Sequence, residues 1–295
     1  MRKIIFKILR ITGLPFLFRE LWQKNRITIL LFHDISAQSA EKVFKYLRSR
    51  YSLVDLNELV DRYEGNKLDG LPKKPLIITF DDGHLKNYDL LPVIQKYEIP
   101  VTIFLCASIV DTKRQFWFQF DNLTSPLQAL KRIPNKERLQ FLKRDGFDQE
   151  VEYNEVQALQ KEHIEEMKDY INFQSHTLFH PILPFCTDQE AREEIVSSKS
   201  FLEEEYGLSI NAISYPNGDY SERDIELSRQ AGYKSGLTVD YGFNSSTTDP
   251  FRLKRLSVND TEDLNELAVK ASGLWGFFKT LNGIVQKAGY HRTTV

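Results

Sequence analysis

LIITFDDG, at residues 76–83, runs from five apolar or β-branched residues directly into two carboxylates and a glycine. Such an apolar run predicts a buried strand, and the glycine permits a tight turn after it. Asp81 and Asp82 would repel each other at this strand end unless a partner charge, such as a metal cation, lay beside them. Neighbouring residues at a strand end point in different directions, so one acid can bind a metal while the other accepts a proton. A pair of solvated turn acids is the alternative.

Outward from this stretch, short apolar runs alternate with helical patterns, which predicts βα units and a mainly parallel sheet. Several runs are almost continuously apolar, as expected for strands that helices cover on both faces. The predicted fold is α/β, a distorted or incomplete (β/α) barrel of seven or eight repeats, in which catalytic groups gather at the carboxyl ends of the strands. One helix is expected to begin after a cap at Thr187 or Asp188 and to end at Gly207. The expected strands span residues 27–32, 52–55, 76–80, 101–106, 171–175, 212–215, 235–239 and 252–258.

Three parts are expected along the chain: a basic amphipathic leader at 1–26, a catalytic domain at 27–260, and a helical tail at 261–295. The leader contains too many basic residues for a membrane span of about 20 residues or a clear signal peptide. We therefore expect a cytoplasmic protein whose leader either packs on the domain or lies on a membrane surface as a peripheral contact. An insertion at about 107–161 carries FWFQF at 116–120. These aromatic residues either stack on sugar rings or form the core of the insertion.

Composition narrows the function classes. The 295 residues are 41% hydrophobic and 27% charged, which is typical of a soluble globular enzyme. The formal net charge of −2 gives no general attraction to nucleic acid, so a nucleic-acid partner is not expected. Cys106 and Cys186 are too few and too far apart for a disulfide framework or a metal-binding pair. We expect two reduced thiols, and a single disulfide is the alternative.

The second chemical signal is SHTLFHP at residues 175–181, which follows another apolar strand. His176 and His180 are four residues apart, so their imidazoles can converge on one ion. Two histidines and one carboxylate form a facial ligand set that leaves positions open for water and substrate. The H-x-x-x-H spacing alone is weak, but together with Asp82 it predicts a divalent metal site. Zinc is the expected metal, and cobalt, nickel and manganese stay open.

In order, TFDDG (79–83), HTLFH (176–180) and SYPNGDYS (214–221) resemble the motifs of the polysaccharide deacetylase superfamily, also called carbohydrate esterase family 4 or the NodB homology domain. The resemblance extends from about residue 27 to 258. It implies a NodB-type barrel and a metal-dependent amide hydrolase that removes N-acetyl groups from a polysaccharide, an oligosaccharide or a glycolipid precursor. It also implies that Asp81 is the catalytic base for the attacking water, while Asp82, His176 and His180 bind the metal.

The third motif departs from the family, whose members normally have R-x-P-aromatic there. Ser214 stands in the place of the arginine, although Tyr215 and Pro216 keep the start of the motif and Asn217 follows them. By the resemblance, the backbone N–H of Asn217 corresponds to the family's oxyanion donor, and we expect this turn to face the substrate.

A replacement for the missing arginine is expected from the late segment DPFRLKRLSV at 249–258. Strand alternation would send Arg252 and Arg255 to opposite faces, so at most one of them could reach inward to tune the base. We favour Arg255, because the Asp-Pro pair places Arg252 nearer a turn. That both are ordinary surface cations stays open.

The general acid needs a replacement, because the family's late histidine has no equivalent motif here; only His291 follows residue 258. His33, in LLFHDI at 30–35, is the expected replacement at the rim of the barrel. This segment resembles the opening segment of a subgroup that includes deacetylases of poly-N-acetylglucosamine. A purely structural histidine is the alternative. His84 and His163 are interpreted as incidental.

Two other functions stay open. Related members of the superfamily hydrolyse cyclic amides, and a relative could also bind carbohydrate without turnover. The altered third motif and the missing late histidine favour the second alternative, whereas the complete set of metal ligands opposes it.

Overall fold

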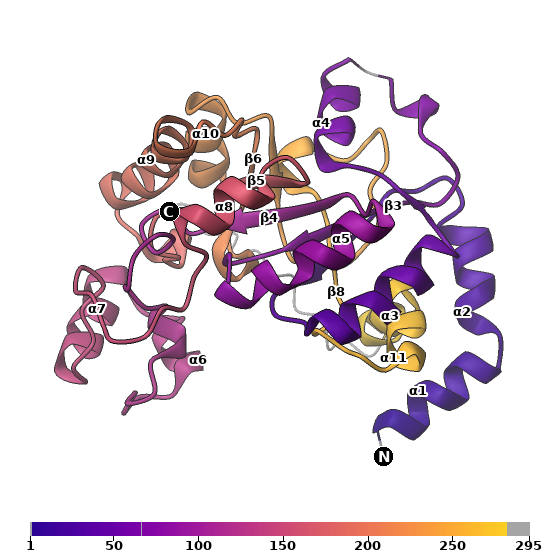
Figure 1. Ribbon diagram of the computed structural model, residues 1–295, viewed down its shortest axis with the longest axis horizontal. Coiled ribbons are helices and arrows are strands. Elements are labelled where there is room, and N and C mark those ends of the chain that lie inside the picture. Colours follow the sequence, from indigo (N-terminus) through magenta and orange to yellow (C-terminus); the bar gives the residue numbers. More distant parts are fainter. Residues whose placement is uncertain (1, 66, 282–295) are drawn as a thin grey trace.

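A parallel sheet that curls into a barrel-like wall, with helices packed on its outer face, forms the centre of the computed structural model, which describes residues 2–65 and 67–281 (Figure 1). The sheet order is β7-β6-β5-β4-β3-β1-β8, every pair is parallel, and β2 pairs with the start of β3. This arrangement confirms the predicted distorted barrel. The strands of the described residues are β1 (Thr28–Phe32), β2 (Ser52–Leu53), β3 (Pro75–Phe80), β4 (Val101–Leu105), β5 (Ile171–Ser175), β6 (Ala212–Ser214), β7 (Ser235–Leu237) and β8 (Leu256–Ser257).

The central strands are buried over their whole length, as their sequences require. Every residue of β1, β3 and β4 is buried, because helices cover one face of the sheet and the barrel core covers the other. The rings of Phe32 and Phe80, opposite each other in register, stack at 5.2 Å. The α-helices are α1 (Arg2–Ile11), α2 (Leu14–Leu17), α3 (Ala37–Arg48), α4 (Leu56–Glu64), α5 (Leu91–Tyr97), α6 (Leu127–Leu130), α7 (Asn135–Arg144), α8 (Lys161–Met167), α9 (Asp188–Tyr206), α10 (Glu222–Gln230), α11 (Leu264–Ala271) and α12 (Leu274–Leu281).

The two edges of the sheet meet through an isolated bridge between Leu237 and Leu253 and a hydrogen bond from the Arg255 N–H to the Asp240 carbonyl oxygen at 3.1 Å. The prediction of one long strand over 252–258 is wrong, because Pro250–Arg252 forms a 3-10 turn. Asp249 stabilises that turn by accepting a hydrogen bond from the Phe251 N–H at 2.9 Å. Within residues 252–258, only β8 pairs with a neighbouring strand, β1, so the barrel is distorted on this side.

The insertion folds around its own aromatic core. Trp117 is buried with Leu130, Leu142 and Phe147, and α6 and α7 lie outside the barrel wall. The interpretation of FWFQF as a core therefore fits the structure better than exposed sugar-stacking rings. Cys106 and Cys186 are buried free thiols, as expected.

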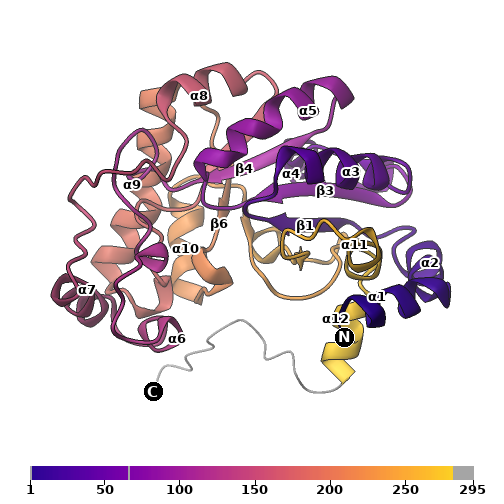
Figure 2. The same ribbon diagram turned by 60° about the horizontal axis from the view of Figure 1, so that its bottom comes forward.

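Helix α1 packs with α11 and α12 on the side of the barrel away from the insertion (Figure 2). Phe6 of α1 is buried against Val269 and Leu274, which belong to the carboxyl-terminal helices. Among the described residues, no helix combines the length and apolar character needed to cross a membrane. His291 and the part of the expected helical tail beyond residue 281 lie outside the described residues.

Candidate metal and catalytic site

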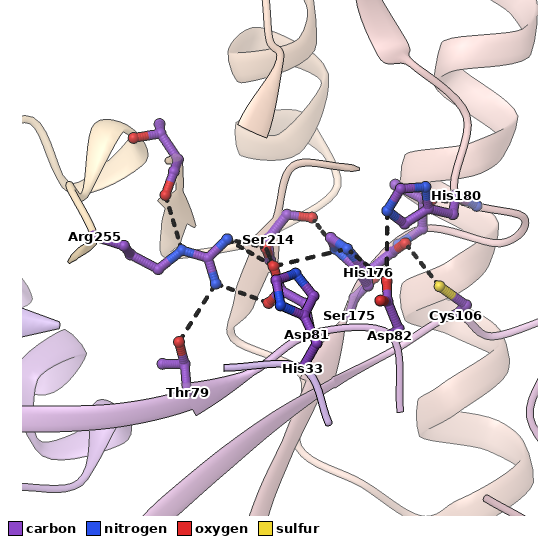
Figure 3. Close-up of polar contacts among 12 residues, drawn as sticks. His33, Thr79, Asp81, Asp82, Cys106, Ser175, His176, His180, Ser214 and Arg255 are labelled. Carbon is purple, nitrogen blue, oxygen red and sulfur yellow. Dashed lines mark hydrogen bonds and ion pairs between the residues drawn. The ribbon is translucent and has the colours of Figure 1, made fainter. Parts of the chain in front are cut away.

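Strand register brings the chemistry-bearing residues to one edge of the sheet. Phe32 is paired with Phe80, so the residues after β1 and β3 leave the sheet at the same level; β5 continues two residues farther, because Phe80 pairs with Ile103 and Ile103 with Phe173. His33 follows β1, the Asp81–Asp82 pair follows β3, and His176 follows β5. Figure 3 shows Asp81 between Arg255 on one side and the two histidines on the other.

The backbone around the site is held in an uncommon conformation. Asp82, Thr177 and His180 have φ values of 74°, 68° and 57°, in the left-handed region that most residues avoid. Gly83 has φ 73°, and a Cβ there would lie 2.7 Å from the Leu105 side chain. The turn after β3 therefore needs this glycine. Strained residues of this kind persist where surrounding structure enforces them, and they concentrate at functional sites.

Asp82, His176 and His180 form one buried cluster. Asp82 Oδ1 lies 3.4 Å from His176 Nε2 and 3.5 Å from His180 Nε2, and one ligand atom from each residue lies within 4.8 Å of the others. His176 Nδ1 donates to the Ser214 carbonyl oxygen at 2.7 Å, so its Nε2 lone pair faces the cluster. Asp82 Oδ1 is buried and has no hydrogen-bond partner among the described residues. A cation at the centre would satisfy this oxygen.

The protonation states of the residues in this cluster also favour cation binding. Burial alone would raise the pKa of Asp82, but its contacts with the imidazoles of His176 and His84 hold it well below its usual value. Burial lowers the pKa of His180 to about 3, so its imidazole is neutral near pH 7. An ionised carboxylate beside neutral imidazole is the protonation state that metal ligation requires. The residues present therefore fit a divalent metal with nitrogen and oxygen ligands.

A ring of neighbours orients these ligands. His84 Nε2 lies 3.1 Å from Asp82 Oδ2, and its ring meets Phe116 edge-on at 5.0 Å. The interpretation of His84 as incidental is therefore wrong: it is buried against a candidate ligand. Its position directly after TFDDG was the only sequence signal. Trp117 Nε1 donates to the His180 carbonyl oxygen at 2.8 Å, so the insertion also supports the site.

Glu194, on α9, holds the loop between the two histidines. Its carboxylate accepts the N–H groups of Leu178 and Phe179 at 2.8 and 3.0 Å. Burial raises the pKa of Glu194 to about 7, although these N–H groups oppose the shift. No sequence motif marked this residue, because its partners are backbone groups.

Asp81 is bound from the opposite side by a guanidinium. Arg255 Nη1 and Nη2 donate to the two oxygens of Asp81 at 2.7 and 2.8 Å, and Nη2 also donates to Ser214 Oγ at 2.8 Å. Ser214 Oγ in turn donates to Asp81 Oδ2 at 3.1 Å. Burial would raise the pKa of Asp81, but the charge and hydrogen bonds of Arg255 outweigh it and keep the pKa below its usual value. Asp81 is therefore an ionised carboxylate beside the ligand cluster.

The structure also places the two remaining candidates, Arg252 and Tyr215. Arg252 pairs with Glu222 at the surface and does not reach Asp81. Tyr215 is fully buried, and its hydroxyl donates to the Phe251 carbonyl oxygen at 3.2 Å, so its side chain lies in the core instead of facing a substrate.

The turn after β6 contains Pro216 and Asn217. Pro216 is buried, whereas Asn217 is exposed with φ 57°. The Asn217 side chain accepts from Lys131 Nζ at 2.7 Å and donates to Asp219 at 2.5 Å. These two hydrogen bonds occupy the side-chain amide of Asn217. The group of this residue that remains to contact a substrate is therefore its backbone N–H.

His33 lies beside Asp81 at the rim, with 41% of its side chain exposed. Its backbone N–H donates to Asp260 Oδ1 at 2.7 Å, and its Nδ1 lies 3.7 Å from Asp260 Oδ2. Burial would lower the pKa of His33, but Asp260, Asp82 and Asp81 together raise it to about 9. The imidazole is thus protonated near neutral pH. His163 instead caps α8, where its Nδ1 accepts the Gln160 N–H at 3.1 Å.

Comparison with known proteins identifies the family and the fold. The sequence profile named polysaccharide deacetylase matches residues 69–236. YxkH of Bacillus subtilis, whose name assigns it provisionally to the polysaccharide deacetylases, is 25% identical over 79% of this chain and 72% of its own length. The poly-β-1,6-N-acetyl-D-glucosamine N-deacetylase of Staphylococcus epidermidis is 22% identical over 77% of this chain and 69% of its own. Among solved structures, IcaB from Ammonifex degensii superposes with a TM-score of 0.62 at 21% identity, covering 85% of this chain and 98% of that one.

Proposed function

Since this chain belongs to the polysaccharide deacetylase family, we propose that it is a metal-dependent hydrolase that removes N-acetyl groups from a carbohydrate. The observation that carries the proposal is the pairing of two features at one sheet edge. Asp82 Oδ1 is a buried oxygen without a hydrogen-bond partner among the described residues, and it faces two imidazoles. Asp81, beside it, is an ionised carboxylate held by Arg255.

We assign the metal to Asp82, His176 and His180, whose ligand atoms lie within 4.8 Å of one another. When bound, a divalent cation such as zinc supplies Lewis acidity, which polarises an amide carbonyl and lowers the pKa of water. Cobalt, nickel and manganese accept the same ligands. His84 keeps the Asp82 carboxylate in place by contacting its second oxygen, at 3.1 Å.

Proton transfer is divided between Asp81 and His33, which lie side by side next to the ligands. Asp81 accepts a proton from the attacking water, and the bidentate contact with Arg255 fixes its orientation. The departing amine then needs a proton, because an amide anion is a poor leaving group. His33 donates that proton, since its neighbouring acids keep it protonated near neutral pH. The backbone N–H of Asn217 stabilises the developing oxyanion, a contact typically worth about 2.7–4 kcal/mol.

The substrate that we propose to test first is β-1,6-linked poly-N-acetylglucosamine. Several curated relatives carry the name of a deacetylase of this polymer, including the protein from Staphylococcus epidermidis. The segment around His33 supports the same subgroup. Shorter oligosaccharides and lipid-linked precursors belong in the same panel, because the site itself does not define polymer length.

The test combines metal analysis with acetate release from that panel of N-acetylated sugars. We expect about one divalent ion per chain and acetate release that a chelator abolishes and the metal restores. Matched variants separate the roles: Asp82→Asn should lose the metal, whereas Asp81→Asn should keep it and lose activity. Stoichiometric metal without acetate release from any substrate would favour a non-catalytic carbohydrate-binding relative. Acetate release that survives complete removal of metal would refute the metal-dependent mechanism.

A further inference from the structure

Exposed apolar side chains gather at one place on this molecule. Nine of the twelve large apolar side chains that are exposed among the described residues belong to the chain ends. We call these nine residues the amino-terminal apolar surface; they are Ile4, Ile5, Ile8, Ile11, Phe16, Leu17, Leu21, Trp22 and Phe277. Soluble proteins rarely expose a large group of apolar residues unless it meets a partner or a membrane.

This surface is not the face by which the leader packs on its own domain. Helix α1 is fixed to α11 by an ion pair between Arg2 and Glu266 and by a hydrogen bond from Arg10 to Asn265 at 3.2 Å. Phe6, on this packing face, is fully buried. Packing on the domain therefore explains only one face of α1 and leaves the other apolar face outward.

The outward face has the pattern of a helix that lies in a membrane interface. Ile4, Ile8 and Ile11 are spaced by four and three residues, so they share one side of α1. Lys3 and Lys7 are also exposed, beside this apolar stripe. Apolar residues that enter the headgroup region, with basic residues at their flank, characterise interfacial helices.

A basic cavity continues the surface. It has a volume of about 920 Å³, and Leu21 and Trp22 of the apolar surface form part of its wall. Lys24, Arg26 and Lys254 line the same cavity. Asp249 and Arg252 line it too, but they are close enough to pair with each other, at 3.7 Å. The cavity thus presents cations next to exposed apolar side chains, and this combination complements anionic lipid headgroups.

We propose that the amino-terminal apolar surface docks the protein on a membrane that contains anionic lipids. Its apolar side chains enter the boundary between headgroups and acyl chains, and the basic cavity binds phosphate headgroups. A second copy is a poorer occupant, because a symmetric pair would bring the basic residues of both copies to one interface. Docking leaves the candidate site open, since α1 and α2 lie near the amino ends of the strands and the site lies at their carboxyl ends (Figure 1).

The experiment is sedimentation of the full chain with vesicles of phosphatidylcholine, with or without phosphatidylglycerol. We expect binding to the anionic vesicles that weakens as salt is added. The variant Ile4→Ser/Ile8→Ser/Trp22→Ser should lose about tenfold or more in affinity. Lys24→Gln/Arg26→Gln should lose about fivefold or more, and only on the anionic vesicles.

Matched controls come from exposed residues elsewhere. Phe201→Ser on α9 removes an exposed aromatic ring, and Lys143→Gln on α7 removes an exposed cation; both should bind vesicles like the wild type. All variants change exposed side chains, so they should keep the wild-type melting temperature and acetate release from a soluble substrate. The outcome is therefore independent of the proposed function.

Three results would overturn the proposal. The first is that the wild type binds neither kind of vesicle. The second is that Ile4→Ser/Ile8→Ser/Trp22→Ser, the apolar variant, binds as tightly as the wild type. A dimer in light scattering that the apolar variant dissociates, without any vesicle binding, would assign the surface to a second copy of the chain.

Discussion

Replacing Arg255 with methionine is expected to lower the free energy of unfolding by about 3–5 kcal/mol near pH 7, because it leaves the Asp81 charge buried without its partner. Asp81 is 4% exposed and Arg255 is 1% exposed. Their two hydrogen bonds, at 2.7 and 2.8 Å, form a bidentate pair that water cannot easily replace. Methionine keeps much of the side-chain volume, so the change tests charge more than packing.

The magnitude follows from what the guanidinium satisfies. Besides Asp81, it donates to the Thr238 carbonyl oxygen and to Ser214 Oγ, both at 2.8 Å. Hydrogen bonds to charged groups contribute about 1.5–3 kcal/mol each. Because Arg255→Met removes several of them, its loss in the free energy of unfolding should be larger than that of most point mutations. Arg252→Met is the matched control. Its pair with Glu222 is at the surface, and we expect a loss of about 0–1 kcal/mol.

The sign of the pH dependence can be worked out. In the wild type the pKa of Asp81 lies below its usual value, so the stability that it contributes is present above about pH 4 and is lost as the pH falls through the folded-state pKa. Without Arg255, burial dominates and raises that pKa. A carboxyl with a raised pKa loses stability as the pH rises, so the difference between the wild type and Arg255→Met should grow from about pH 4 to pH 7.

Urea denaturation of the chelator-treated proteins, at about pH 5 and about pH 7, measures this difference. Chelation removes bound metal as a source of positive charge beside Asp81, and the protonated His33 is common to the proteins compared. A loss for Arg255→Met no larger than that for Arg252→Met would refute the reasoning. So would a loss that is the same at both pH values.

Three further predictions concern activity. Asp81→Asn should lower the turnover for acetate release at least about 100-fold while metal content, measured by mass spectrometry, stays at the wild-type level. Asp260→Asn should lower the pKa of His33, so the fall in kcat/KM at high pH should begin at a lower pH; His33→Ala should reduce turnover at least about tenfold. His84→Ala should weaken metal binding by about 10–100-fold in competition with a chelator, and saturating metal should restore most of the activity.

Each of these predictions has an outcome that contradicts it. Loss of metal from Asp81→Asn would mean that the roles of the two adjacent acids are reversed. Asp34→Asn is the control for Asp260→Asn, because Asp34 pairs with Lys86, at 3.1 Å. An identical pH profile for both asparagine variants would remove Asp260 from the tuning of His33. Wild-type metal affinity in His84→Ala would reduce His84 to a packing residue.

Regular elements with local signals could be predicted from the sequence. The strand expected at 171–175 is β5, and the helix expected after Thr187 is α9, whose cap is a reciprocal pair between Thr187 and Glu190 and whose end is Gly207. Both depend on hydrogen-bonding and burial patterns within a few residues. The register that gathers the strand ends follows from the parallel fold class itself.

Contacts between distant segments could not be predicted in this way. His84 follows a recognised motif, yet only the folded turn after Gly83 places its ring against Asp82. Glu194 lies on a regular helix, so the sequence alone indicates an acid at the surface. In the structure it is buried against the backbone of a loop. The strand expected at 252–258 was predicted too long, because the turn that begins at Pro250 extends through Arg252 and only Leu256–Ser257 forms a strand.

The third motif has Ser214 where an arginine was expected, and Arg255, from a distant segment, makes the bidentate contact with Asp81. Ser214 is the last residue of β6, and Arg255 lies just before β8. Both side chains contact Asp81 although they are far apart in the sequence. A second long cation at position 214 would have to enter the volume that the buried Arg255 guanidinium already fills, and two buried like charges would repel. Serine is short and can both accept from Arg255 and donate to Asp81, so it completes the contact without competing for it. The variation in the motif is thus compatible with an ionised base.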